Sequence, residues 1–95
     1  MPQYVIERNV PGAGKLSDSE IQKMSAKSNS VLREMTAEGT PIRWEHSYVA
    51  GDKLYCVYDA ANEQAVREHA RRGGFPADKV SQVARVINPA SAGKG

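Results

Sequence analysis

Residues 41–59, PIRWEHSYVAGDKLYCVYD, constrain the fold of this chain more than any other stretch. Two runs rich in aromatic and β-branched residues lie on either side of the sequence AGDK, residues 50–53, and this pattern is typical of a β-hairpin. A hairpin alone is only marginally stable in water, so neighbouring segments must cover it. The stretch also holds the only Trp, the only Cys and three of the four Tyr. We therefore expect any chemical site of the protein to lie here.

Two amphipathic helices are predicted, one before and one after this hairpin. Ser17 begins a capping box, and apolar residues then recur at helical spacing until Gly39, which is placed to end the helix. Asp59 can cap a second helix that runs to about residue 72 and has a thin buried face that includes His69. Each helix therefore has one apolar side that suits it to cover a sheet.

Two further strands complete the pattern. Residues 3–8 form a short β-type run, and residues 80–87 alternate loosely between apolar and polar side chains. The order strand, helix, hairpin, helix, strand predicts a ferredoxin-like α+β sandwich, with a four-stranded antiparallel sheet and both helices on one face. We expect one domain over residues 1–88 and a flexible tail over residues 89–95. The other sheet face is left bare, so we expect a homodimer.

Charge and composition narrow the range of functions. The formal net charge of +2 and the lack of long runs of like charge argue against a nucleic-acid partner. A single cysteine cannot close an internal disulfide, and no apolar run has the length of a membrane span, so we expect a cytoplasmic protein without a membrane partner. Arg67, Arg71 and Arg72 are interpreted as a solvated helix face, with docking of another protein, there or at an exposed strand edge, as the alternative.

The register of the hairpin decides which side chains meet. With a period of two residues, Trp44, His46 and Tyr48 share one face of the first hairpin strand. An even loop places His46 near Val57, whereas an odd loop or a bulge places it opposite Cys56. The sequence leaves both registers open. We favour the odd loop, because it gathers the more apolar sets of side chains onto one face of the hairpin.

His46 and Cys56 are the residues of this hairpin whose side chains ligate transition metals. Imidazole and thiolate bind zinc, nickel and copper, and His69 adds a second imidazole to the chain. No HxxxH or CxxC spacing is present, and two His and one Cys do not fill a coordination shell. Asp, Glu or Tyr oxygens, waters or a second protomer must then supply the rest. The alternative interpretation is a hydrogen-bonded sheet histidine and a small buried thiol.

Several motifs resemble those of a family of small bacterial domains: YVIER near the start, the PGAGKLS loop, the W-x-HSYV…DK-x-YCVY hairpin and the VREHARRGGFPAD-V segment. The family was catalogued as of unknown function and includes a nickel-binding protein. The resemblance implies a ferredoxin-like fold, a homodimer, and nickel binding linked to nickel-responsive growth. We therefore expect a non-catalytic nickel-binding protein that acts in metal buffering or nickel-responsive regulation. On donor chemistry we expect His46, Cys56 and His69 to contact the metal, with Tyr4 and Glu7 as further candidates.

An enzyme is the alternative function. In this interpretation a small dimeric α+β-barrel protein acts on an organic ligand held in a cavity at the sheet face. Trp44, Tyr48 and Tyr58 line the cavity, and His46 is the proton-transfer group. The hypothesis predicts a closed, mostly apolar pocket of roughly a few hundred cubic ångströms with a histidine at its wall.

Overall fold

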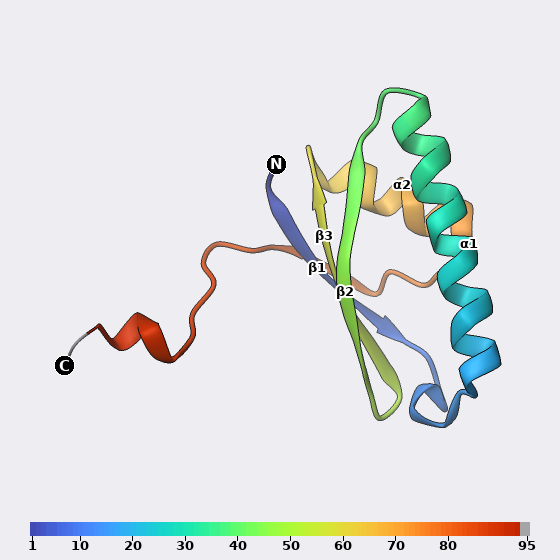
Figure 1. Cartoon of the computed structure of the whole chain (residues 1–95), viewed down its shortest axis with the longest axis horizontal. Helices are drawn as coiled ribbons and strands as arrows, with labels where there is room; N and C mark the ends of the chain where they lie inside the picture. The colour runs from blue at the N-terminus through green and yellow to red at the C-terminus, as the bar shows by residue number, and fades with distance from the viewer. Residues whose placement is uncertain (94–95) are drawn as a thin grey trace.

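The computed structural model describes residues 1–93 and contains a four-stranded antiparallel sheet with two helices on one of its faces (Figure 1). The strand order across the sheet is β2-β3-β1-β4. The predicted ferredoxin-like α+β fold is therefore confirmed. The elements are β1 (Gln3–Asn9), α1 (Asp18–Ala37), β2 (Ile42–Ala50), β3 (Lys53–Ala60), α2 (Glu63–Gly73) and β4 (Lys79–Gln82), with short 3-10 helices at Ala13–Lys15 and Pro89–Ala92.

Side chains cap the N-termini of both long helices. At α1 the predicted capping box is present: the Glu20 amide donates to Ser17 Oγ, and the Ser17 amide donates to the Glu20 carboxylate, both at 3.1 Å. At α2 the Ala65 amide donates to Asn62 Oδ1 at 2.9 Å. Each cap satisfies an amide that has no partner inside its own helix, so each helix begins at a defined residue.

Two boundaries differ from those predicted. Asp59 does not cap the second helix, because β3 pairs with β1 as far as this residue and Gln3 Nε2 donates to its carboxylate at 3.1 Å. The fourth strand ends at Gln82 and not at Ile87, because Gln82 pairs with Tyr4, one residue from the start of β1. The chain then leaves the sheet, and Ile87 is 75% exposed.

The segment after β4 extends away from the sheet and the helices (Figure 1). It contains one short 3-10 helix, Pro89–Ala92. Residues 94 and 95 of the expected tail lie outside the described residues, so the flexibility of residues 89–95 stays a prediction. Across the described part of the chain, every helix is too short or too polar to cross a membrane.

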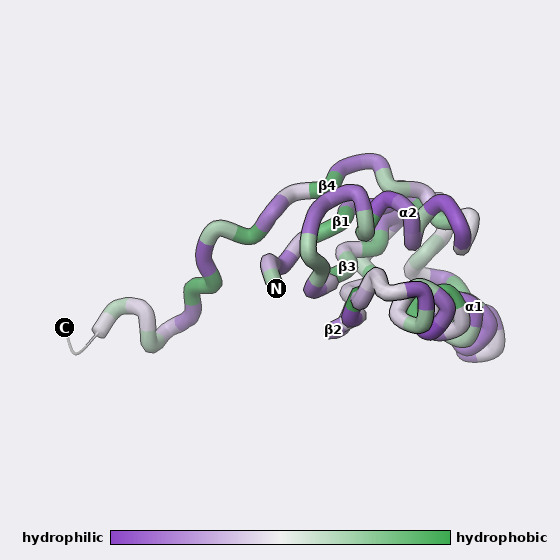
Figure 2. Tube along the Cα trace, turned by 90° about the horizontal axis from the view of Figure 1, so that it is seen from above, coloured by the Kyte–Doolittle hydropathy of each residue, from purple (hydrophilic) through white to green (hydrophobic). Residues whose placement is uncertain are grey.

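The core lies between the sheet and the helices, which are on the same side of the strands when the molecule is seen from above (Figure 2). Strands β1 and β3 are central, and every second residue of each is buried. Burying one side chain as completely as Ile6 stabilises the fold by about 1.5–3 kcal/mol. The buried apolar side chains include Tyr4, Ile6, Val31, Met35, Ile42, Leu54, Cys56, Tyr58 and Val66.

The hairpin has an even loop. Ala50 pairs with Lys53, which leaves two residues in the turn, and Gly51 takes a φ of +60° that other residues rarely adopt. Counting back from the turn, His46 pairs with Val57. The expectation of an odd loop, with His46 opposite Cys56, is therefore wrong.

A β-bulge interrupts β2 between Trp44 and His46. Beyond it Trp44 pairs with Tyr58, so these two side chains lie on the helix-covered face. His46 and Tyr48, on the turn side of the bulge, lie on the uncovered face with Val57. The prediction that Trp44, His46 and Tyr48 share one face is wrong, because the extra residue reverses the alternation of side chains within the strand.

Replacing the α1 cap should lower stability. We predict that Ser17→Ala decreases the free energy of unfolding by about 1 kcal/mol, because the Glu20 amide loses its acceptor. Urea unfolding followed by circular dichroism measures this change. Ser19→Ala, two residues later in the first turn, is the matched control and should change stability by less than half as much. Equal losses in both variants would contradict the capping role of Ser17.

Candidate functional site

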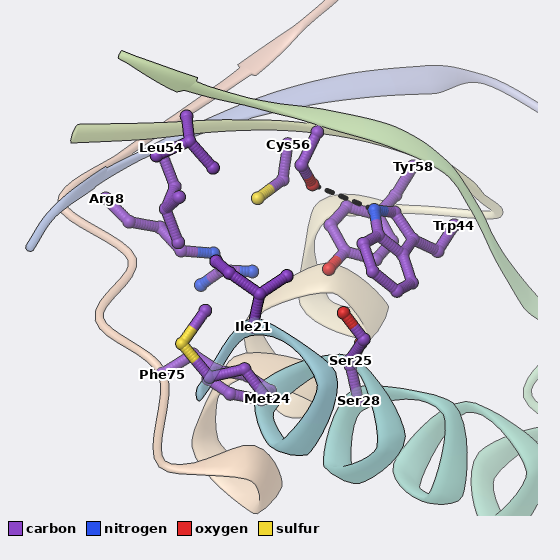
Figure 3. Close-up of a pocket in the computed structure, with 12 residues that line it drawn as sticks. Arg8, Ile21, Met24, Ser25, Ser28, Trp44, Leu54, Cys56, Tyr58 and Phe75 are labelled. Atoms are coloured by element: carbon purple, nitrogen blue, oxygen red, sulfur yellow. Dashed lines mark hydrogen bonds between the residues drawn. The ribbon is translucent and has the colours of Figure 1, made fainter. Parts of the chain in front are cut away.

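An apolar pocket lies between the sheet and α1, inside the helix-covered layer (Figure 3). Its volume is about 160 Å³. Three of the four strands, β1, β2 and β3, contribute side chains to the pocket, and α1 contributes one face of its first three turns. The lining residues are Arg8, Ile21, Met24, Ser25, Ser28, Trp44, Ser47, Val49, Leu54, Cys56, Tyr58 and Phe75.

Aromatic side chains form one end of this pocket. The Trp44 and Tyr58 rings stack with centroids 6.5 Å apart, and Trp44 Nε1 donates to Ser47 Oγ at 2.9 Å across the bulge. Burial raises the pKa of Tyr58, and the Arg8 charge opposes that rise. Of the three residues predicted to line a cavity, Trp44 and Tyr58 lie at this pocket, whereas Tyr48 is on the opposite face and is 61% exposed.

Arg8 is the charged residue of the pocket, and it was not among the site residues predicted from the sequence. It is only 2% exposed. Its Nη1 donates to the Pro76 carbonyl, and its guanidinium lies 5.5 Å from the centroid of the Phe75 ring. Its Nη2 is buried without a hydrogen-bond partner in the described structure. The available signal was the alternation along the first strand, which places Arg8 on the same side as Tyr4 and Ile6.

His69 is fully buried between the two helices and the sheet. Its Nε2 lies 3.0 Å from Ser28 Oγ, and its ring contacts Tyr58 and Phe75 at centroid distances of 5.0 Å and 5.7 Å. Burial, assisted by the positive charge of Arg8, lowers the pKa of His69 to about 4. This histidine is therefore neutral at physiological pH and joins α1 to α2 inside the core.

The five predicted metal contacts are divided between the two faces of the sheet. Tyr4, Cys56 and His69 are buried on the helix-covered side. His46 is exposed on the uncovered side, with its ring 5.1 Å from that of Tyr48. Glu7 is half-buried on that same side and forms an ion pair of 3.7 Å with Lys53. Within residues 1–93, no three His, Cys, Asp or Glu side chains are grouped closely enough to hold a metal.

This division also bears on the alternative of an enzyme. The pocket is mostly apolar, but it lies beneath the helices rather than on the bare face, and His46 does not line it. The proton-transfer group assigned from the sequence is therefore on the far side of the sheet from the pocket.

The arginines of α2 form surface ion pairs. Arg67 bonds to Glu63, and Arg71 bonds to Glu68. Arg72 bonds to Glu68 at 2.7 Å and reaches across to Glu38, the residue at the C-terminal cap of α1, at 2.9 Å. Hydrogen bonds from Arg71 and Arg72 lower the pKa of Glu68 to about 2. These ion pairs lie at the solvent-exposed surface, and those of Arg72 connect α2 to α1.

The sheet order, the two helices on one face and the buried pocket define a small ferredoxin-like α+β domain. A family model described as "Nickel responsive protein SCO4226-like" matches residues 4–83, so the chain belongs to the SCO4226-like family. The structure resembles the crystal structure of SCO4226 from Streptomyces coelicolor A3(2), with a TM-score of 0.71 and 16% sequence identity over 90% of this chain and 99% of that chain. At this identity the likeness shows the fold. No curated protein matches the chain significantly.

The lowered pKa of His69 predicts a pH dependence of stability. The unfolded chain has a histidine of ordinary pKa, about 6.5, so it binds more protons than the folded chain between pH 6.5 and pH 4. The stabilisation is therefore complete above pH 6.5 and is lost as the pH falls. We predict that the free energy of unfolding drops by roughly 2 kcal/mol from pH 7.5 to pH 5 because of this group.

Urea unfolding at the two pH values measures this drop. His69→Gln should remove it, whereas His46→Gln, which changes the exposed histidine on the other face, should keep it. A drop that survives in His69→Gln would contradict the assignment to the buried imidazole.

Proposed function

We propose that this protein binds nickel without catalysing a reaction and that it acts in nickel buffering or nickel-responsive regulation. Membership of a family described as nickel responsive supports the choice of metal. The proposal places the nickel site at His46, because the imidazole of this residue is exposed on a sheet face that neither helix covers. The lone Cys56, which is a free thiol, also supports a cytoplasmic location for this activity.

Accessibility separates the candidate ligands. A metal ion entering from water reaches His46 without any rearrangement, because this side chain is exposed. His69 is fully buried, with one ring nitrogen beside Ser28 and with the cationic Arg8 close enough to lower its pKa. Cys56 is 4% exposed and packs in the core. We therefore assign the first nickel contact to His46.

One protomer does not supply a complete nickel site. Nickel commonly takes nitrogen and oxygen donors in tetragonal or octahedral arrangements, and the uncovered face offers two kinds of donor: one imidazole, and the half-buried carboxylates of Glu7 and Asp59. A second copy packed face to face doubles both donors, and water supplies the rest. The half-buried Val5, Tyr55 and Val57 on this face give such a dimer an apolar centre. We propose that the homodimer completes the site.

Nickel titration by calorimetry tests the assignment of the ligand. We predict that His46→Ala weakens nickel binding by at least about tenfold, which corresponds to one lost coordination bond of about 1.4 kcal/mol. Cys56→Ser and His69→Gln change buried donors and should bind nickel as the unmodified protein does. Undiminished binding in His46→Ala, with loss in His69→Gln, would overturn the assignment.

Solution mass tests the dimer. Tyr48 and Val49 are neighbours in β2 that lie on opposite faces and are 61% and 44% exposed. We predict that Tyr48→Glu shifts the protein toward monomer, because it places like charges against each other at the proposed interface. Val49→Glu is the matched control and should leave the mass unchanged. Light scattering after size exclusion measures both. A Tyr48→Glu protein that keeps the dimer mass would contradict this interface.

A further inference from the structure

The nickel proposal leaves one buried charge unexplained, that of Arg8. A guanidinium does not lose its proton in a protein, so the pocket contains a permanent positive charge that is 98% removed from solvent. Within residues 1–93, no carboxylate forms an ion pair with it. Burying a charge without a partner of opposite sign is strongly unfavourable. The fold therefore retains this arginine at a cost in stability.

The neighbours of Arg8 compensate for only part of its burial. The Pro76 carbonyl accepts from Nη1, and the Phe75 ring lies beneath the guanidinium at 5.5 Å. Both lie on the side of the α2–β4 connection. The other terminal nitrogen, Nη2, has no hydrogen-bond partner among residues 1–93. Figure 3 shows the guanidinium directed into the pocket, between Leu54 of the sheet and Ile21 of α1.

The space that the Arg8 guanidinium lines is apolar and has the size of a small ring. The pocket volume is about 160 Å³, and an engineered cavity of about 150 Å³ in another protein holds one benzene molecule. Its walls are carbon and sulfur surfaces from Ile21, Met24 and Leu54, and Trp44 lies at one end. Val49 is 44% exposed, so the pocket has a route to solvent along β2.

We propose that this pocket binds a small monocarboxylate with an apolar body, of the size of benzoate. The carboxylate accepts from the Arg8 guanidinium and supplies the missing opposite charge. The Tyr58 hydroxyl lines the same pocket and offers a further donor. The apolar body lies against Met24 and Ile21. A phosphate ion lacks this body and would face mostly hydrocarbon, and a metal cation would be repelled by Arg8.

This site is independent of the proposed nickel site. His46 is exposed on the uncovered face of the sheet, whereas Arg8 and the pocket lie on the helix-covered face. Binding of a carboxylate can therefore be measured with the protein as it is, in the absence of added metal, and failure of one proposal leaves the other unchanged.

The fluorescence of Trp44 reports on the pocket directly, because this residue is the only Trp of the chain and lines the site. Titration of the full chain with benzoate should give a saturable change in its emission, and calorimetry should give the same dissociation constant. Benzamide, which has the same ring without the charge, and inorganic phosphate should bind at least about tenfold more weakly. Equal binding of benzamide or phosphate, or no saturation with benzoate, would overturn the proposal.

Three variants locate the binding. Arg8→Met keeps an apolar stem, removes the charge, and should weaken benzoate binding roughly 10- to 100-fold. Arg85→Met removes an exposed arginine after β4 and should leave it unchanged. Ile21→Trp fills the pocket while keeping Arg8, and should abolish binding; it also serves as the test if Arg8→Met does not fold. Full binding by a folded Arg8→Met protein, or by Ile21→Trp, would contradict the proposed site.

Discussion

The bulge between Trp44 and His46 in β2 is the constraint on which both candidate sites depend. One extra residue lets Trp44 turn toward the helices, where it stacks on Tyr58 and closes an end of the pocket. The same residue leaves His46 on the uncovered face, in register with Val57. A regular strand would place both side chains on one face. The hydrogen bond from Trp44 to Ser47 spans this irregularity and holds the two halves of the strand in their different orientations.

The sheet thereby separates two kinds of chemistry. The inner face holds a fixed positive charge, hydroxyl groups and an apolar cavity, and its histidine is held neutral by burial and by Arg8. The outer face presents an accessible imidazole and the half-buried carboxylates of Glu7 and Asp59. The proposed metal contact and the proposed carboxylate site therefore lie on opposite sides of the sheet. The Ser28–His69 contact at 3.0 Å ties α1 to α2 over the inner face.

The sequence predicted those features that local patterns encode. The capping box at Ser17 and the turn at Gly51 are short-range signals, and both are present in the structure. Asp59 and Asn62 are both residue types that cap helices. Asn62 caps α2, because Asp59 is held in β3 by its pairing with β1, which is a long-range contact. The bulge left no such signal, because W-E-H-S-Y fits an uninterrupted alternation equally well. The alternation along β1 places Arg8 on the buried face with Tyr4 and Ile6. The pattern alone does not explain why a charged side chain is buried there, because the explanation depends on residues that are distant in the sequence.

The most direct test of this account is to follow the amide resonances of the protein while nickel is added, since the paramagnetic ion broadens the signals of residues near it. We predict broadening that is centred on His46 and spreads to its neighbours on β2 and β3, with the resonances around His69 in α2 retained. Broadening centred on His69 or Cys56, with sharp signals around His46, would contradict the assignment of the metal to the uncovered face.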